Sequence, residues 1–308
     1  QMCIRDRGPG EDGDAVAVRA RKEPEDDDAR GGAVEPTAPR SERRRLALVG
    51  GAMQDLAWCS RRFHARHELG LREHGASHGL SEEAGALAKR VLLTLPWARV
   101  LRDPEAALRR VCAAAGLHAS GVGAAGALTM LKRFAKTALA RAVAADESLV
   151  VGKMVPWGLR VMDGETELSV TGELDLVLRG EAMGRPEVLV ARVATGVDLD
   201  EGDLPGGVGP LDAALELALG GRALGQRMRE GAGAGAEAGA VRGAVVVLSE
   251  EGDGGAVLLP GWDDAVIEAR ALELARGLVV SRASGRWEGR ARHVCEGLRC
   301  GFIGRCHG

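Results

Sequence analysis

The spacing of apolar residues predicts helices in the first half of the chain. Between residues 81 and 95, apolar side chains recur at intervals of three and four and so share one helix face: Ala84, Leu87, Ala88, Val91, Leu92 and Leu95. Ser81 suits the N-cap of this helix, because its hydroxyl can accept a hydrogen bond from a first-turn amide. Similar spacing predicts helical structure within residues 46–75, 104–115 and 124–145.

The period changes to two in "LSVTGELDLVL", which predicts a strand over residues 168–178. One strand face carries Leu168, Val170, Leu174, Leu176 and Leu178, and the other carries Ser169, Thr171, Glu173 and Asp175. A turn leads to a second, more buried strand over residues 187–195, so the two form a hairpin.

Three further elements complete the pattern. We expect a helix at 211–229, a buried strand at 241–249, and a helix at 263–280 with one apolar face made by Ile267, Ala271, Leu274 and Leu278. This order of elements predicts an α/β or α+β domain with a central mixed sheet flanked by helices.

Composition limits the class of protein. The 308 residues are 45% hydrophobic with a net charge of -3, which is enough for one sizeable core. We find no apolar run of transmembrane length and no signal-peptide pattern, so we predict a cytoplasmic protein without a membrane partner. In that reducing compartment, clustered cysteines indicate metal ligands or catalytic thiols rather than disulfides.

The first 45 residues are not expected to belong to the folded domain. Residues 1–7, "QMCIRDR", resemble a translated sequencing-library adaptor, so we exclude them and expect native sequence upstream to be missing. Residues 8–45 combine mixed charge, proline and glycine with few large apolar side chains, which predicts a disordered linker. The ordered domain is predicted over residues 46–308.

Three cysteines gather in "CEGLRCGFIGRC", at Cys295, Cys300 and Cys306. Soft thiolates select iron–sulfur clusters or zinc, and tetrahedral sulfur sites use four ligands. Cys112 lies in an alanine-rich helix, where we expect a small buried apolar residue. Cys59 lies in "LAWCSRRFHARHELGLRE", a basic and polar segment.

That segment resembles the opening "CPRRF…LGL" of the nuclease domain in RecB-like PD-(D/E)XK nucleases. In their iron–sulfur subset, which includes AddB-type helicase–nucleases, one cysteine comes from this segment and three from the C-terminus. The resemblance implies a [4Fe–4S] cluster that joins the N- and C-terminal segments of a restriction-endonuclease-like fold, held by Cys59, Cys295, Cys300 and Cys306. Two alternatives stay open: one zinc ion at the same thiolates, with His293 or His307 replacing a cysteine, and cysteines without metal.

The hairpin is similar to the family pattern "G-x-x-D-x-V … V-V-D-x-K-T-G", in which two carboxylates hold a divalent metal ion. The resemblance places Asp175 at the first carboxylate, but Arg192 at the second and Ala194 at the lysine. Lys89 stands where a helix should carry a metal-ligand histidine. We therefore expect no effective Mg²⁺ site and a degenerate hydrolytic centre.

Two other positions complete the comparison with the family. Glu147 matches an acidic position that precedes the hairpin, so Asp175 and Glu147 are the residual catalytic candidates. The downstream Gln/Tyr signature has no counterpart in "GPLDAALELAL". A register slip that brings Glu187 toward a metal is the alternative alignment.

Basic side chains beside the expected cluster are candidates for DNA phosphate contacts, which are independent of sequence and sensitive to salt. They are Arg61, Arg62, His64, Arg66 and His67. An ordinary solvated helix face explains the same pattern equally well.

The resemblance implies a C-terminal, iron–sulfur, nuclease-like domain of a bacterial DNA repair helicase, with hydrolysis lost or weak. Its expected partners are single-stranded DNA and an upstream helicase domain or subunit. One alternative is an active metal-dependent exonuclease on single-stranded DNA with migrated ligands. The other is an interaction module cross-linked by zinc, with no nucleic-acid role.

Overall fold

A computed structural model describes residues 44–72, 80–164, 166–195, 208–232, 240–249, 255–297 and 300–307. The suspected adaptor at residues 1–7 and the predicted linker up to residue 43 lie outside these ranges. None of the described helices is both long and apolar enough to cross a membrane.

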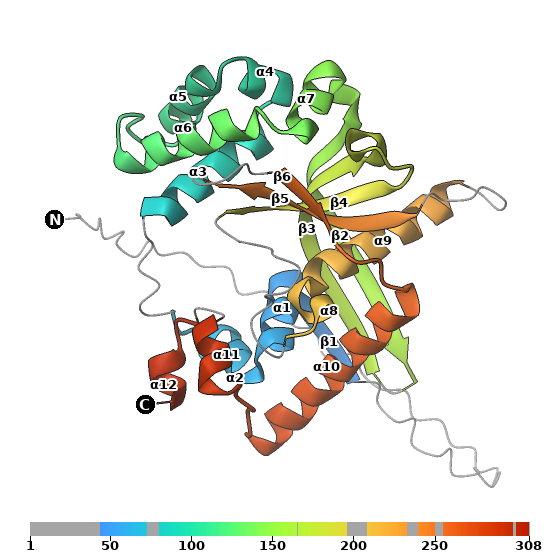
Figure 1. Cartoon of the computed structure of the whole chain (residues 1–308). Coiled ribbons are helices and arrows are strands. Elements are labelled where there is room, and N and C mark those ends of the chain that lie inside the picture. The colour runs from blue at the N-terminus through green and yellow to red at the C-terminus, as the bar shows by residue number, and fades with distance from the viewer. Residues whose placement is uncertain are drawn as a thin grey trace, which may run out of the picture. The chain divides into compact units, whose positions relative to one another are not determined.

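A six-stranded mixed sheet forms the centre of the described chain (Figure 1). Its strand order is β1 (Arg44–Val49), β3 (Thr166–Arg179), β4 (Val188–Thr195), β5 (Val241–Leu248) and β6 (Gly255–Leu258), and β2 (Val150–Asp163) also pairs with β3. The β1–β3 and β4–β5 pairs are parallel and the others are antiparallel. The predicted hairpin is thus the internal β3–β4 pair.

Helices cover both faces of this sheet (Figure 1). One layer comprises α3 (Leu80–Thr94), α4 (Trp97–Arg102), α5 (Pro104–Ala114), α6 (Val122–Phe134) and α7 (Ala138–Ala145). The other comprises α1 (Gly50–Trp58), α8 (Pro210–Ala213), α9 (Leu215–Ala232) and α10 (Asp264–Ser284). Short elements complete the fold: α2 (Ser60–Phe63), η1 (His64–Glu68), η2 (Glu147–Leu149), η3 (Gly180–Met183), α11 (Arg292–Gly297) and α12 (Ile303–His307). The predicted α/β class with a central mixed sheet flanked by helices is confirmed.

Strand β4 explains why both layers bury apolar surface. Its side chains alternate, so Leu189, Ala191 and Val193 pack under α3–α7 while Val190 packs under α9 and α10. A strand that is buried on both faces typically has a continuous run of apolar residues, and "VLVARVA" in β4 is such a run except for its arginine. Arg192 is the polar interruption of that run.

Strand β3 departs from the simple alternation that its sequence predicts. Leu168, Val170 and Leu174 pack in the core beneath α9 and α10, but Leu176 and Leu178 pack in the core beneath α3–α7. The change of face coincides with a distortion in β2, where Met154 adopts a left-handed backbone with φ 51°. Its neighbours Lys153 and Val155 pair with Leu176 and Leu174, so the distortion lies opposite Asp175.

Several element predictions need correction. Residues 44–49 form strand β1, not linker or helix, because this short segment pairs in parallel with β3 and gains backbone hydrogen bonds that local spacing cannot reveal. Strands β2 and β6 were not predicted, since proline, glycine and lysine obscure the alternation in β2. The predicted helix 124–145 is two helices, because Thr137 caps α7 by accepting a hydrogen bond from the Ala140 amide at 3.1 Å.

Trp157 sets how closely the helices approach the sheet. Trp157 lies in β2 and is 4% exposed. A methyl group at Gly172, its register partner in β3, would lie 2.6 Å from the indole Cζ2. A methyl group at Gly220 in α9 would lie 2.7 Å from Leu174 Cδ2 and 3.1 Å from the indole Nε1. Two glycines from different elements therefore leave the space that this ring fills.

We predict that Gly172→Ala lowers the free energy of unfolding by about 1–3 kcal/mol, because the added methyl overpacks the core against Trp157. Gly158→Ala in β2 is the matched control, since its methyl would lie 3.7 Å from Thr171 Cγ2 and 3.9 Å from the Val170 carbonyl oxygen, both ordinary contacts. Urea denaturation of both variants measures the difference. Equal losses in the two variants would contradict the packing argument.

Candidate functional site

A cavity of about 490 Å³ opens over one end of the sheet. Its floor crosses four strands, from Asp175 in β3 through Arg192 in β4 and Val245 in β5 to Val257 in β6. Arg192 pairs in register with Val245, and Val245 pairs with Val257. The floor is therefore charged at one end and apolar at the other.

Helices from both layers supply the walls of this cavity. They contribute Gln54 from α1, Lys89 from α3, and Pro210, Ala213, Ala214, Glu216 and Leu217 from the α8–α9 segment. Glu173, Ala191, Leu258, Leu259 and Pro260 complete the lining. The cavity thus combines residues that are far apart in the sequence.

Asp175 is held by two partners in this cavity. Its Oδ2 lies 2.6 Å from the Lys89 ammonium and accepts a 2.8 Å hydrogen bond from the Val193 amide. The side chains of Lys89 and Asp175 are 33% and 15% exposed, so the ion pair is largely shielded from water. The lysine ammonium occupies the position that a cation bound to Asp175 Oδ2 would take.

Glu216 is a carboxylate of the cavity that the sequence did not single out. Burial raises its pKa, Arg192 and Lys89 lower it in part, and Asp175 and Asp55 raise it further. Its backbone amide donates to Gln54 Oε1 at 3.1 Å, which ties the start of α9 to α1. No local motif marks Glu216, because the fold of α9 across the sheet creates its position.

The second residual catalytic candidate lies apart from the cavity. Glu147 is exposed in η2 and is absent from the described lining of the cavity. Its electrostatic influence is on Lys153, whose pKa burial lowers to about 8 while Glu147 partly raises it. Lys153 donates to the carbonyl oxygens of Leu92, at 2.7 Å, and Leu95 near the end of α3, so it has a structural role. The structure does not bring Glu147 and Asp175 to one site.

The predicted cysteine ligands lie where the residues after α1 meet the C-terminal segment. Cys59 follows α1, and its Sγ lies 3.9 Å from the Glu288 carbonyl oxygen. Cys295, Cys300 and Cys306 pack with Ala65 and other apolar residues in one small cluster. Cys59, Cys295 and Cys300 are buried, Cys306 is half-buried, and none is in a disulfide.

The four thiols are close enough to influence one another. Burial raises the pKa of Cys295 to about 11, and the thiols of Cys300, Cys59 and Cys306 raise it further, while Arg61 lowers it. Even so, the described part of the chain contains no group of three His, Cys, Asp or Glu side chains arranged to hold a metal ion. Cys112 lies elsewhere, 1% exposed in the core beneath α3–α7, as predicted.

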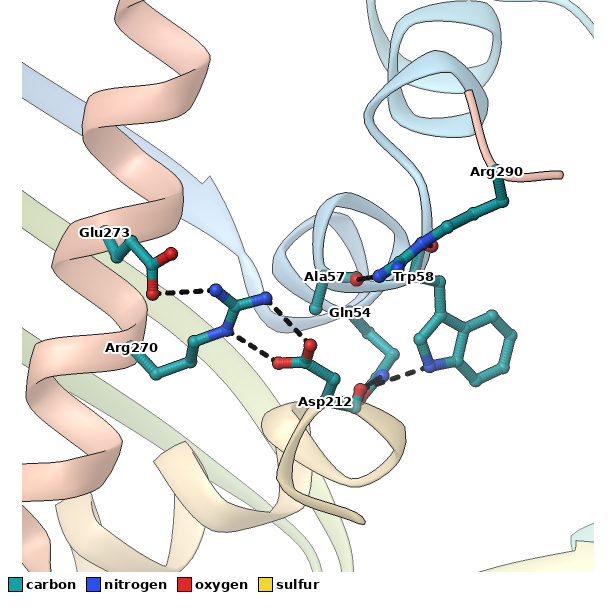
Figure 2. A network of polar contacts seen from close by, with 7 residues as sticks. All are labelled: Gln54, Ala57, Trp58, Asp212, Arg270, Glu273 and Arg290. Atoms are coloured by element: carbon teal, nitrogen blue, oxygen red, sulfur yellow. Dashed lines mark hydrogen bonds and ion pairs between the residues drawn. The ribbon is translucent and has the colours of Figure 1, made fainter. Parts of the chain in front are cut away.

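Arg290 connects the cysteine-bearing segment to helix α1 (Figure 2). Its Nε donates to the Trp58 carbonyl oxygen at 2.8 Å, and its Nη2 donates to the Ala57 carbonyl oxygen at 3.2 Å. These are C-terminal carbonyls that a helix cannot satisfy internally. The Cys295 thiol in turn lies 3.9 Å from the Arg290 carbonyl oxygen, so one residue contacts both α1 and the cysteine cluster.

Asp212 connects α1 to α8 and α10 in the same view (Figure 2). Its backbone carbonyl accepts hydrogen bonds from the side chains of Gln54 and Trp58, the latter at 3.1 Å. Its carboxylate receives two hydrogen bonds from Arg270, at 2.8 and 2.7 Å, and Arg270 also donates to Glu273 at 2.7 Å. Bidentate arginine–carboxylate pairs of this kind fix geometry strongly.

Three of the basic residues predicted to contact DNA lie around Asp55, which is 4% exposed. Arg62 Nε and Arg66 Nη1 lie 3.1 Å from its carboxylate oxygens, and His67 Nε2 lies at 2.8 Å. The side chains of Arg62, Arg66 and His67 are 11%, 51% and 28% exposed, respectively. A solvated helix face is therefore wrong for Arg62, and Arg66 is the most accessible of the three.

The other two basic candidates contact the C-terminal segment. Arg61 Nη1 donates to the Cys306 carbonyl oxygen at 3.3 Å. The His64 ring stacks on Trp287 with centroids 4.3 Å apart and an angle of 18° between the rings. Both residues help to hold this segment against α2 and η1.

Comparison with known proteins gives little further information. No model of a protein family matches the chain, and no curated protein matches it. The chain is similar to a solved structure titled "Crystal structure of SSO0001", with 14% identity over 86% of this chain and 87% of that one, at a TM-score of 0.38.

We predict that Asp55→Asn lowers the free energy of unfolding by about 3 kcal/mol, because it removes the buried negative charge that Arg62, Arg66 and His67 share. Glu105→Gln is the control, since it removes the same charge from an exposed i,i+4 pair with Arg109, where about 0–0.5 kcal/mol is expected. Urea denaturation at neutral pH measures both. A loss for Asp55→Asn no larger than the control would contradict the role assigned to this carboxylate.

Proposed function

We propose that this chain is a DNA-binding, nuclease-like domain of the PD-(D/E)XK type whose hydrolytic activity is lost or weak. The observation that carries the proposal is the 2.6 Å ion pair between Lys89 and Asp175 inside the cavity. In keeping with the RecB and AddB resemblance, the domain would act with a helicase domain or subunit in DNA repair.

Electrostatics explains why this ion pair opposes metal-dependent cleavage. Mg²⁺ binds oxygen ligands, usually through one or two carboxylates. A divalent ion placed 4 Å from a lysine ammonium meets a repulsion of roughly 8 kcal/mol at an effective dielectric constant of 20. Arg192 lines the same cavity and adds a second positive charge where the resemblance requires a carboxylate.

The arrangement of the sheet supports the finer fold assignment, a restriction-endonuclease-like core. The β3–β4 hairpin is internal to the sheet, and Asp175 of β3 contacts the α3–α7 layer through Lys89. Strand β5 then joins β4 in parallel, after α9 has crossed the face of the sheet.

The cysteine donors support a [4Fe–4S] cluster as the proposed cofactor, with a single zinc ion as the alternative. Soft sulfur donors in a largely apolar setting are the ligand type that either metal centre uses, although no three of them are arranged to hold a metal ion in the described part of the chain. Cys59, Cys295, Cys300 and Cys306 would hold it. When bound, the centre would supply a cross-link between Cys59 and a segment that begins 236 positions later, without a role in hydrolysis.

One observation favours a second candidate, the active exonuclease on single-stranded DNA with migrated ligands. The Glu216 carboxylate shares the cavity with Asp175, so it offers a second acid from a helix instead of from β4. For this candidate Lys89 would have to leave Asp175 when a metal ion binds.

We predict that the protein binds a labelled single-stranded oligonucleotide with an affinity that falls steeply as salt rises, and does not shorten it in Mg²⁺. Arg66→Ala should weaken binding and reduce the salt dependence, because this arginine is the most exposed of the candidate set around Asp55. Arg110→Ala, at an exposed arginine in α5, is the control. Gel assays with and without Mg²⁺ measure binding and cleavage together. Strong Mg²⁺-dependent cleavage that disappears in Asp175→Ala would establish the exonuclease instead.

We predict that anaerobically purified protein is brown and contains iron and sulfide. Cys59→Ala should abolish the colour and lower the stability by freeing the C-terminal segment, whereas Cys112→Ala should keep the colour and cost only a cavity term. Absorbance and elemental analysis measure both variants. Stoichiometric zinc without iron would favour the zinc-linked module, and full iron loading of Cys59→Ala would exclude Cys59 as a ligand.

A further inference from the structure

The cavity contains two opposite charges that do not pair with each other. Arg192 and Glu216 both line it, yet within the described ranges the guanidinium and the carboxylate form no hydrogen bond or ion pair. Lys89 and Asp175 differ in this respect, because they bind each other. The Arg192 guanidinium can therefore donate hydrogen bonds to a ligand in the cavity, and the Glu216 carboxylate can accept them.

The opposite end of the cavity is apolar and follows the pleated surface of the sheet. Val245 and Val257 are register partners in neighbouring strands, and Leu217 and Leu258 lie on the walls beside them. A planar ring can lie against such a surface. The volume of about 490 Å³ is within the usual range for small-molecule sites and is sufficient for one nucleoside.

The balance of charge argues against a phosphate as the group that enters. The lining includes two cationic side chains, Lys89 and Arg192, and three carboxylates, Glu173, Asp175 and Glu216. Among the described lining residues, carboxylates outnumber cationic side chains, so this part of the lining does not favour a phosphate. A neutral group with both donors and acceptors matches the hydrogen-bonding groups of Arg192 and Glu216 better.

We propose that this cavity receives one unpaired nucleobase of a single strand and favours guanine. Guanine offers O6 and N7 as adjacent acceptors for an arginine, and its N1–H and amino group can donate to a carboxylate. Arg192 would bind the first edge and Glu216 the second, with the ring against Val245 and Val257. The inference rests on the proposed function, because the bound strand supplies the base.

The other natural bases do not offer the same combination. Adenine places a donor beside N7, so it cannot accept two hydrogen bonds from one guanidinium there. Thymine and cytosine have smaller rings and lack N7. An unpaired base also enters a pocket at little cost, because no base pair has to be broken.

The test compares four DNA strands of twelve nucleotides each: oligo(dT) and the same strand with a single central dG, dA or dC. Fluorescence anisotropy at fixed salt should show the dG strand binding about tenfold more tightly than the other three. Arg192→Met and Glu216→Gln should each remove most of this preference, measured as the ratio of the dG-strand affinity to the oligo(dT) affinity of the same variant. Arg110→Met is the control and should keep the preference. Equal binding of all four strands, or a preference that survives in both cavity variants, would overturn the proposal.

A second measurement separates this inference from the proposed function. Titration of 2′-deoxyguanosine and thymidine into the protein, followed by calorimetry, tests the cavity without a strand. Binding of deoxyguanosine in a protein that binds no strand would overturn the DNA-binding proposal and support the cavity as a base site. Salt-sensitive strand binding with no response to deoxyguanosine and no dG preference would overturn the inference alone. Urea denaturation of each variant shows that lost preference does not come from unfolding.

Discussion

Burying Gln54 and Asp55 in helix α1 obliges the fold to bring a partner to each of them. Both residues are 4% exposed, and an unpaired polar group at such depth costs about 1–3 kcal/mol or more. Gln54 is satisfied by Asp212 and by the amide of Glu216, and Asp55 by the basic residues that follow α1. Two adjacent side chains thereby fix the start of α9, the position of α8 and the path of η1.

The cavity depends on this arrangement. Gln54 reaches it from α1 and holds the backbone of Glu216, so the depth of that carboxylate is set by a contact to another helix. On the opposite wall, the charge of Asp175 is neutralised by Lys89, a residue of the other helical layer. The site is therefore assembled from both layers of the fold. Asp175 and Glu216 therefore have distinct electrostatic settings, the first balanced by a neighbouring ammonium and the second partly desolvated by burial.

Periodicity predicted most of the regular structure correctly, and it failed where partners are distant. Helices α3, α5 and α10 follow from apolar spacing, because each presents a regular apolar face, and the β3–β4 hairpin follows from its apolar pattern although its strands contribute to both cores. Strand β1 could not be recognised, since six residues carry too little pattern and their pairing partner is more than 100 positions away. The same limit applies to the cavity. Asp175 stood out on the polar face of a strand, but Glu216 and Gln54 acquire their places only through the packing of α9 and α1 against the sheet.

Arg290 has a consequence for how the protein is made. The last carbonyls of α1 accept hydrogen bonds from a side chain that is 232 positions away in the chain. A ribosome that adds about 5–20 residues each second needs roughly 10–50 s to cover that distance. Throughout this interval the C-terminal end of α1 must rely on water or on transient partners. The protein therefore cannot complete this helix end during early synthesis, and α1 is fully capped only after the segment that carries Arg290 has been made.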